Sequence, residues 1–281
     1  MNGFLLIDKP TGMTSHDVVY HVKKALKIKK VGHTGTLDPF ASGLLILCVG
    51  KATKLASLFS NLGKSYEGVI KFFKHYDTYD VTGTVEKEKV IHLDMNQLQI
   101  TAKSFEKAYD QEPPMYSAIK IDGKKLYELA RSGKTIDRPK RPVEIKKFEV
   151  FDFKNDEISF KTDVSKGTYI RSLAVDYAQS LGTYAALKTL RRTKVGRYHV
   201  LDAIKLDEAS FEHLISFETF FKDYNRLTLS DYLIHLVKNG IYLDERQIVT
   251  NKPFVVVDKH DKMIAYYEVI EENKYKPILI F

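Results

Sequence analysis

Strand-like and helical apolar patterns alternate along this chain, and the alternation constrains the fold more than any other feature. Residues 66–73 alternate as on a half-buried strand, and residues 143–153 and 158–164 also predict strands. In residues 168–181 the apolar side chains instead form one stripe at helical spacing, and Gly182 suits the position just past a helix end. Strands interleaved with helices predict a mixed α/β fold.

Another helix is predicted to begin near residue 15. Thr14 or Ser15 can cap it, and Asp17 stands where a capping box needs an acid. Val18 and Val22 then share its apolar face.

Three segments in the middle of the chain have weaker signals. Residues 101–110 favour a helix, and residues 124–132 favour a short basic helix. Residues 112–120 contain two prolines, which remove donors and push the preceding residues into extended geometry, so we expect no regular helix there.

The sequence pattern changes near residue 226, where short β-rich runs separated by turn signals begin. We therefore predict a large domain at 1–227 and a small all-β module at 228–281. A module of that size buries little surface by itself, so we expect it to dock on the large domain.

Positive charge is concentrated before the C-terminal module. The net charge is +8, residues 226–281 are neutral, and residues 120–147 hold ten basic and four acidic side chains. Residues 23–30 add five lysines. Such clusters attract polyanions through counterion release, although a solvated lysine-rich surface is an equally good interpretation of the charge alone.

Several classes of function find no support in the sequence. Cys48 is the single cysteine, which excludes an internal disulfide and suits a reducing cytoplasm. No segment approaches the length of a membrane span, so we expect a cytoplasmic protein with no membrane partner. Phosphate-loop, serine-elbow, zinc and calcium patterns are not found either, so we expect no metal.

One loop is a candidate for chemistry. The stretch GHTGTLDPFASGLL, residues 32–45, combines Asp38, His33 and glycines that let the backbone approach a ligand closely. Asp-Pro pairs are common turn formers, so the loop alone favours a turn-forming role for Asp38.

The loop does not stand alone, because it resembles the catalytic motif of the TruB-type tRNA pseudouridine synthases. The segments DKPTGMTS, EPPMYSAIKIDGKKLYELAR, SKGTYIRSLAVDYAQSLG and LRRTKVGRY resemble other motifs of that family, in the family's order. The resemblance implies the pseudouridine synthase fold, with a largely antiparallel central sheet crossed by an RNA cleft. It also implies that the C-terminal module is a PUA-like barrel, as in bacterial members.

The resemblance also implies a reaction. Members of the family isomerise the T-loop uridine of tRNA, position 55 in tRNA numbering, to pseudouridine. The reaction has no group donor and no net redox change, so it implies no cofactor. The partner is the T-arm stem-loop of tRNA, and we expect the enzyme to be a monomer.

Three catalytic residues follow from the motif match. Asp38 corresponds to the catalytic aspartate, acting as a nucleophile at C1′ or as a base toward the sugar. Arg171 corresponds to the arginine that pairs with it; the alternative is a charge on the helix surface. Tyr66 corresponds to the active-site tyrosine, for which we favour stacking on the base over proton transfer. Its alternative role is lining the core face of its strand.

Other positions correspond to RNA contacts in the family. His33 fills the space that the flipped base leaves. Lys9 is also expected to bind RNA, and with Pro10 it supports the catalytic loop. Asp80 lies near the RNA or caps a turn, and Leu190 packs at the base pocket or in the core. The basic side chains expected at the RNA are Lys124, Lys125, Arg131 and Lys166.

The chain departs from the family pattern at a few places. His75 and Tyr76 precede Asp77 in a turn that commonly reads T-D-T-x-D, and Ala186 stands where a histidine is frequent. Two rival functions are considered: a non-catalytic RNA-folding protein and a guide-RNA pseudouridine synthase. The presence of Asp38, Tyr66 and Arg171 argues against the first, and the short C-terminal module without long basic tails argues against the second.

Overall fold

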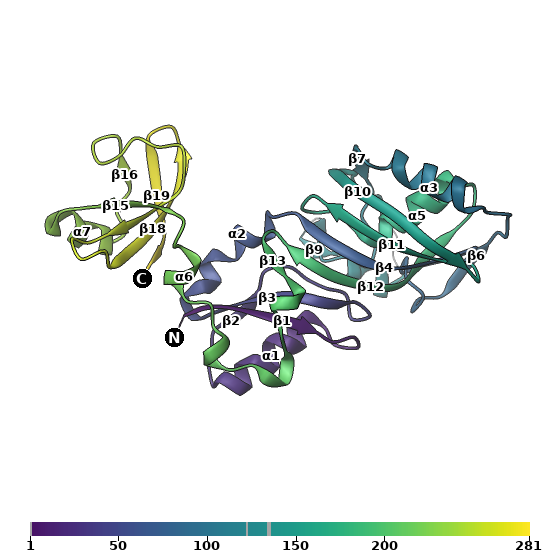
Figure 1. Ribbon diagram of the computed structural model, residues 1–281, viewed down its shortest axis with the longest axis horizontal. Coiled ribbons are helices and arrows are strands. Elements are labelled where there is room, and N and C mark those ends of the chain that lie inside the picture. The colour runs from purple at the N-terminus through teal and green to yellow at the C-terminus, as the bar shows by residue number, and fades with distance from the viewer. Residues whose placement is uncertain (1, 122, 134–135) are drawn as a thin grey trace.

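A computed structural model describes residues 2–121, 123–133 and 136–281. Its main feature is a ten-stranded mixed sheet, in which β1–β14 and β3–β12 are the parallel pairs and every other pair is antiparallel (Figure 1). This confirms the predicted mixed fold with a largely antiparallel sheet. In sheet order the strands are β14 (Ile204–Lys205), β1 (Gly3–Lys9), β3 (Ser42–Val49), β12 (Ala185–Val195), β4 (Lys64–Phe72), β11 (Glu157–Val164), β10 (Arg141–Lys154) and β7 (Ala108–Gln111), with β2 (Val31–His33) beside β3 and β13 (Tyr198–His199) beside β12.

The first helix, α1 (Ser15–Leu26), forms as predicted. Thr14 is its cap, and its hydroxyl and the Asp17 carboxylate complete the capping box. The helix packs on one face of β1 and β3, where alternate residues such as Leu5 and Leu47 join Val18 in one core. These two strands are apolar on both faces, because their other residues pack toward the C-terminal module.

The far half of the sheet is covered by α3 (Met95–Ser104) and α5 (Ile170–Ser180) (Figure 1). The predicted helix at 101–110 is wrong beyond Ser104. Residues 108–111 form β7, which pairs with residues 141–144 of β10, and this long-range pairing overrides the local helical signal. Residues 112–119 contain no helix, as the prolines predict.

Smaller elements project from the main sheet. The hairpins are β5 (Lys74–Tyr76) with β6 (Val85–Glu88), and β8 (Lys120–Ile121) with β9 (Lys124–Lys125). The short helices are α2 (Ala56–Ser60), α4 (Leu126–Arg131) and α6 (Phe217–Phe220), together with 3-10 turns at 50–55, 200–202, 206–208 and 211–213. In the described residues, no helix is both long and apolar enough to cross a membrane.

The C-terminal module is a five-stranded sheet with one helix, α7 (Asp231–Lys238). The module is therefore not all-β as expected, because it contains α7, an amphipathic helix that Ser230 caps. The sheet begins at Asn225, three residues before the expected boundary, and the division at 227/228 stays a proposal. Its strands, in order, are β15 (Asn225–Thr228), β17 (Phe254–Val257), β18 (Met263–Glu271), β19 (Lys274–Ile280) and β16 (Leu243–Asp244).

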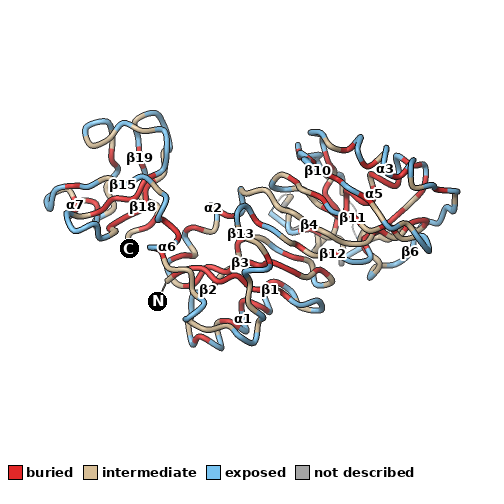
Figure 2. Tube along the Cα trace, viewed as in Figure 1, coloured by how far each residue is buried: buried red, intermediate tan, exposed pale blue. Residues whose placement is uncertain are grey.

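An aromatic cluster joins the module to the main sheet. Phe4 of β1 packs on Phe220, and Phe221 packs on Tyr266 of β18 with ring centroids 4.9 Å apart. Figure 2 shows the buried segments running through β1, β3 and into β18. The contact meets the expectation that the module docks on the large domain.

Removal of this cluster should destabilise the protein. Phe221→Ala should lower the free energy of unfolding by about 3–5 kcal/mol, because Phe221 is fully buried and its loss leaves a cavity. Chemical denaturation measures the change. The control is Tyr232→Ala, whose ring is 73% exposed and whose loss should cost no more than about 0.5 kcal/mol. Equal effects of the two variants would contradict the docking role.

Candidate active site

Asp38 and Arg171 form a two-pronged ion pair at the centre of the site. Nε of Arg171 lies 2.9 Å from Oδ2 of Asp38, and Nη2 donates to Oδ1 at 3.0 Å. The side chain of Arg171 is 5% exposed, whereas that of Asp38 is 32% exposed and accessible to a ligand. Arg171 is thus not a surface charge on α5, and the loop at 32–45 and the start of α5 meet at one point.

Arg171 also donates two hydrogen bonds to backbone carbonyls. Nη1 donates to the carbonyl of Thr78, and Nη2 donates to the carbonyl of Tyr116, both at 2.8 Å. Oδ2 of Asp80 lies 3.9 Å from Nη1. One guanidinium therefore gathers the catalytic loop, the turn at 78–80 and the proline segment around Tyr116.

Asp80 caps a turn and also faces the active-site arginine. It is buried, and its Oδ1 accepts hydrogen bonds from the backbone N–H and hydroxyl of Thr82, which is turn capping. Its Oδ2 faces Arg171.

The charge of Asp80 also affects the pKa of Asp38. Burial raises the pKa of Asp38 above its ordinary value, Arg171 lowers that pKa, and Asp80 raises it further, with burial the largest effect.

The N-terminal motif holds the catalytic loop from one side. The Ser15 hydroxyl accepts from the N–H of Leu37 and donates to its carbonyl, and the N–H of Gly12 donates to the carbonyl of Pro39. Nζ of Lys9 donates to the carbonyls of Pro10 and Met13.

Lys9 is therefore a support of the loop and not an RNA contact. Its residue is 0% exposed, so it has no surface to offer to RNA, and burial lowers the pKa of its amine to about 8. The expectation that Lys9 binds RNA is contradicted by this burial, because its ammonium is committed to backbone carbonyls inside the protein.

The catalytic loop is also held from below by Arg192 of β12. Its Nε donates to the carbonyl of Leu44, and its Nη2 to that of Gly35, at 2.8 and 3.1 Å. Gly43 lies so close to the backbone of Arg192 that a Cβ there would come within 2.3 Å of its carbonyl oxygen. Gly43 therefore allows β3 and β12 to approach each other closely. The sequence had instead suggested that the glycines of this loop let the backbone approach a ligand.

Tyr66 and Leu190 are buried in the large core cluster of the main domain, and Tyr66 pairs with Arg192 in the β4–β12 register. Tyr66 is 9% exposed and lies with Ile70 and Phe72 in that core, so its structural role is present whatever it does in catalysis. The base-contacting roles of Tyr66 and Leu190 stay predictions.

His33 ends β2 at the entrance of the catalytic loop. Its buried Nδ1 has no hydrogen-bond partner among the described residues. Burial, with the nearby charges of His16 and Arg192, lowers the pKa of the imidazole, which therefore favours the neutral form. A neutral, half-buried ring fits the expected stacking role, which stays a prediction.

The basic candidates lie farther out. Lys124 is exposed on β9, and Lys166 is exposed with its Nζ 3.1 Å from the amide oxygen of Asn61. Lys125 and Arg131 belong to β9 and α4, and their side chains lie outside the described part of the structure, as does Lys134 of the basic segment.

The departures from the family pattern have clear places. His75 lies 3.6 Å from Glu86 across the β5–β6 hairpin, and Asp77 accepts from the N–H of Thr84, so the turn still presents Thr78 and Asp80 to Arg171. Ala186 is completely buried in β12 and offers no surface to RNA.

A polar chain behind α5 fixes the start of that helix, and sequence reasoning missed it. The side-chain amide of Gln111 pairs with both backbone groups of Tyr169, accepting from its N–H at 2.8 Å and donating to its carbonyl at 3.2 Å. Gln111 also donates to the hydroxyl of Tyr109, which donates to Asp176 on α5 at 3.0 Å. Arg171 is thereby held at a helix end that is fastened to β7.

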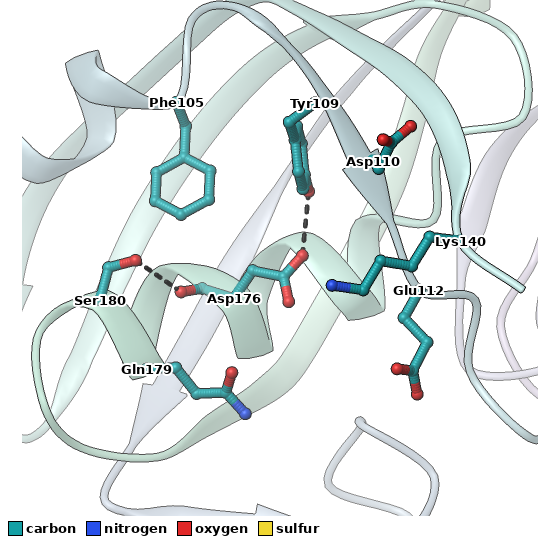
Figure 3. Close-up of a pocket in the computed structure, with 8 residues that line it drawn as sticks. All are labelled: Phe105, Tyr109, Asp110, Glu112, Lys140, Asp176, Gln179 and Ser180. Atoms are coloured by element: carbon teal, nitrogen blue, oxygen red, sulfur yellow. Dashed lines mark hydrogen bonds between the residues drawn. The ribbon is translucent and has the colours of Figure 1, made fainter. Parts of the chain in front are cut away.

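This region contains a pocket of about 490 Å³, which Lys140 and Glu112 also line. Figure 3 shows Tyr109 directed at Asp176 there. Burial raises the pKa of Asp176 to about 6. Asp38, Tyr66 and Arg171 do not line it. In the described residues, no group of three or more histidine, cysteine or acidic side chains is arranged to hold a metal ion.

Comparisons with known proteins point in one direction. The model of the TruB family pseudouridylate synthases (N-terminal domain) matches residues 23–170. The chain is 53% identical to tRNA pseudouridine synthase B of Onion yellows phytoplasma and 47% identical to that of Acholeplasma laidlawii, over 100% of both chains in each case. Among solved structures, a Cbf5–Nop10–Gar1 complex has a chain with a TM-score of 0.72 and 24% identity, covering 99% of this chain and 84% of that one. This last likeness shows the shared fold.

The coupling between the two acids gives a prediction. Asp80→Asn should lower the pKa of the Asp38 carboxyl, because the charge of Asp80 is one of the causes that raise it. The Asn side chain still offers an oxygen to Thr82. Titration of the Asp38 carboxyl carbon by ¹³C NMR measures the shift. Asp110→Asn, at the pocket behind α5, is the control and should leave the titration unchanged. An equal or higher pKa in Asp80→Asn would contradict the coupling.

Proposed function

Because this chain belongs to the TruB family of pseudouridylate synthases, we propose that its Asp38–Arg171 site isomerises the T-loop uridine of tRNA. The chain is a tRNA pseudouridine synthase and thus an isomerase. The observation that carries the proposal of the site is the pairing of a ligand-accessible carboxylate with a buried guanidinium. The guanidinium favours the ionised carboxylate and so opposes the effect of burial, which raises the pKa of Asp38.

The reaction rearranges one nucleotide. The bond between N1 of the base and C1′ of the ribose breaks, the base turns, and C5 bonds to C1′. The proton on C5 is lost and N1 gains one, so substrate and product have the same atoms. No group donor or oxidant enters the balance.

Asp38 supplies the reactive group in this proposal. As a nucleophile, its carboxylate attacks C1′ as the N1–C1′ bond breaks, and it leaves when C5 attacks C1′. As a base, it removes a proton from the sugar as the N1–C1′ bond breaks, and it returns that proton when C5 bonds to C1′. Both routes require the ionised carboxylate. The two contacts from Arg171 hold it in one orientation, which supports either route by positioning.

Tyr66 and His33 are proposed to handle the base. The target uridine is stacked within the T-loop, so it must be flipped out at a cost of a few kcal/mol. The Tyr66 ring is proposed to stack on the flipped base, and the neutral His33 ring to fill the space that it leaves. His33 ends β2 at the start of the catalytic loop, and Tyr66 pairs with Arg192, whose side chain binds that loop; both observations support this assignment.

Basic residues on both sides of the site are proposed to bind the T-arm. Lys124 and Lys166 are exposed and offer charge to phosphates, and Lys125 and Arg131 are proposed to do the same on sequence grounds. We propose that the protein acts as a monomer. We infer that the protein works in the cytoplasm, where its tRNA substrate is.

Replacement of the central carboxylate tests the reaction. Asp38→Asn should abolish pseudouridine formation, because the amide is neither a nucleophile nor a base. The assay is tritium release from 5-labelled uridine in an unmodified T-arm stem-loop.

Binding of the same RNA should survive in Asp38→Asn. Asp94→Asn is the control, since asparagine also caps α3 and activity should be unchanged. Turnover by Asp38→Asn near that of the wild type would overturn the assignment.

Charge reversal at Lys124 tests the RNA surface. Lys124→Glu should weaken binding of the stem-loop and reduce the slope of log affinity against log salt by about 1, because one phosphate contact is lost. Filter binding at several salt concentrations measures both. Lys154→Glu, at the exposed end of β10, is the matched control. An unchanged slope in Lys124→Glu would remove this residue from the interface.

A further inference from the structure

Arg192 is a buried cation that forms no ion pair with any acid in the described part of the chain. Its residue is 2% exposed in the middle of β12, and none of the ion pairs among the described residues includes it. Its neighbour Arg191, in contrast, forms a two-pronged pair with Asp8 and is about one-third exposed. An unpaired buried charge is costly, and an apolar side chain could fill the same space at less cost.

The partners of Arg192 are all carbonyls of the catalytic loop. Gly35 and Thr36 precede Asp38, and their carbonyls accept from Nη2 at 3.1 Å and Nη1 at 3.4 Å. Leu44 follows Asp38, and its carbonyl accepts from Nε at 2.8 Å. The guanidinium thus ties the two arms of the loop together beneath the catalytic carboxylate.

The backbone of Arg192 strengthens the same tie. It pairs with Gly43 in the parallel β3–β12 contact, and Gly43 can approach so closely because it has no Cβ. The backbone and side chain of Arg192 therefore both hold residues 43–44, which follow Asp38. Its side chain also holds residues 35–36, which precede Asp38.

We propose that Arg192 is a positioning residue for the isomerisation: it sets the place of Asp38 by fixing both arms of the loop at 32–45. The proposal rests on the proposed function of Asp38. Arg171 binds the Asp38 carboxylate directly, whereas Arg192 binds the backbone of the loop that carries Asp38. Only a planar fork with several N–H groups can reach carbonyls on both arms, and a lysine ammonium is a single point.

The test separates geometry from charge. Arg192→Lys keeps the charge and loses the fork, whereas Arg192→Gln keeps a planar donor and loses the charge. Both should lower the single-turnover rate constant on the T-arm stem-loop by about 100-fold, because small misplacement of a catalytic group has effects of this size. The dissociation constant of the RNA should change less than threefold.

Arg226→Lys is the control. It changes an arginine of the C-terminal module, whose ion-pair partner Asp261 lies outside the catalytic loop, and it should leave the rate constant unchanged. Circular dichroism establishes that each variant is folded. A folded Arg192→Lys with a rate constant within threefold of the wild type would overturn the proposal, as would an equal loss in Arg226→Lys.

Amide hydrogen exchange keeps the proposal testable apart from activity. In the wild type, the N–H groups of Thr34 and Leu37 should be protected, since they bond to Ile46 and Ser15 within the fixed loop. In Arg192→Lys they should exchange at least tenfold faster, while those of α5 should not change. Fast exchange of the loop in the wild type would overturn the proposal. A wild type inactive on the RNA would instead overturn the proposed function and leave the exchange result to decide the role of Arg192.

Discussion

The ion pair between Asp38 and Arg171 is the interaction on which the rest of the site depends. It joins a loop near the N-terminus to a helix start 133 residues later. The loop rests on the half of the sheet that is covered by α1, and the helix covers the other half. The pair therefore exists only when both halves of the ten-stranded sheet have formed and face each other correctly.

The supports of this pair are mostly backbone contacts. Ser15 and Arg192 bind loop carbonyls and amides, while Gln111 grips both backbone groups of Tyr169 just before Arg171. Backbone contacts of this kind fix the direction in which a side chain leaves the chain, and reactive geometry depends on direction as much as on distance. The buried guanidinium of Arg171 then completes its own shell with carbonyls at Thr78 and Tyr116.

The C-terminal module contributes to the site through the layer beneath it. β1 and β3 are apolar on both faces, with α1 on one and the aromatic cluster around Phe221 on the other. β3 begins at the end of the catalytic loop, so the module stabilises a strand that leads out of the active site. Its neutral charge is no obstacle to this structural role.

The sequence alone determined the motifs, the helices α1 and α5, the strands with strong periodicity, and the identity of Asp38, Arg171 and Tyr66 as candidates. These features depend on neighbouring residues or on matches to a family, which a linear reading contains. It failed where distant pairing overrides local preference, as in residues 108–111, and it placed buried Lys9 at the RNA. Only the tertiary structure decided that Asp80 faces Arg171, that Gln111 holds α5, and that Arg192 ties the catalytic loop. Each of those contacts joins residues that lie far apart in the chain, and the partner of a polar side chain is set by what the folded sheet brings beside it.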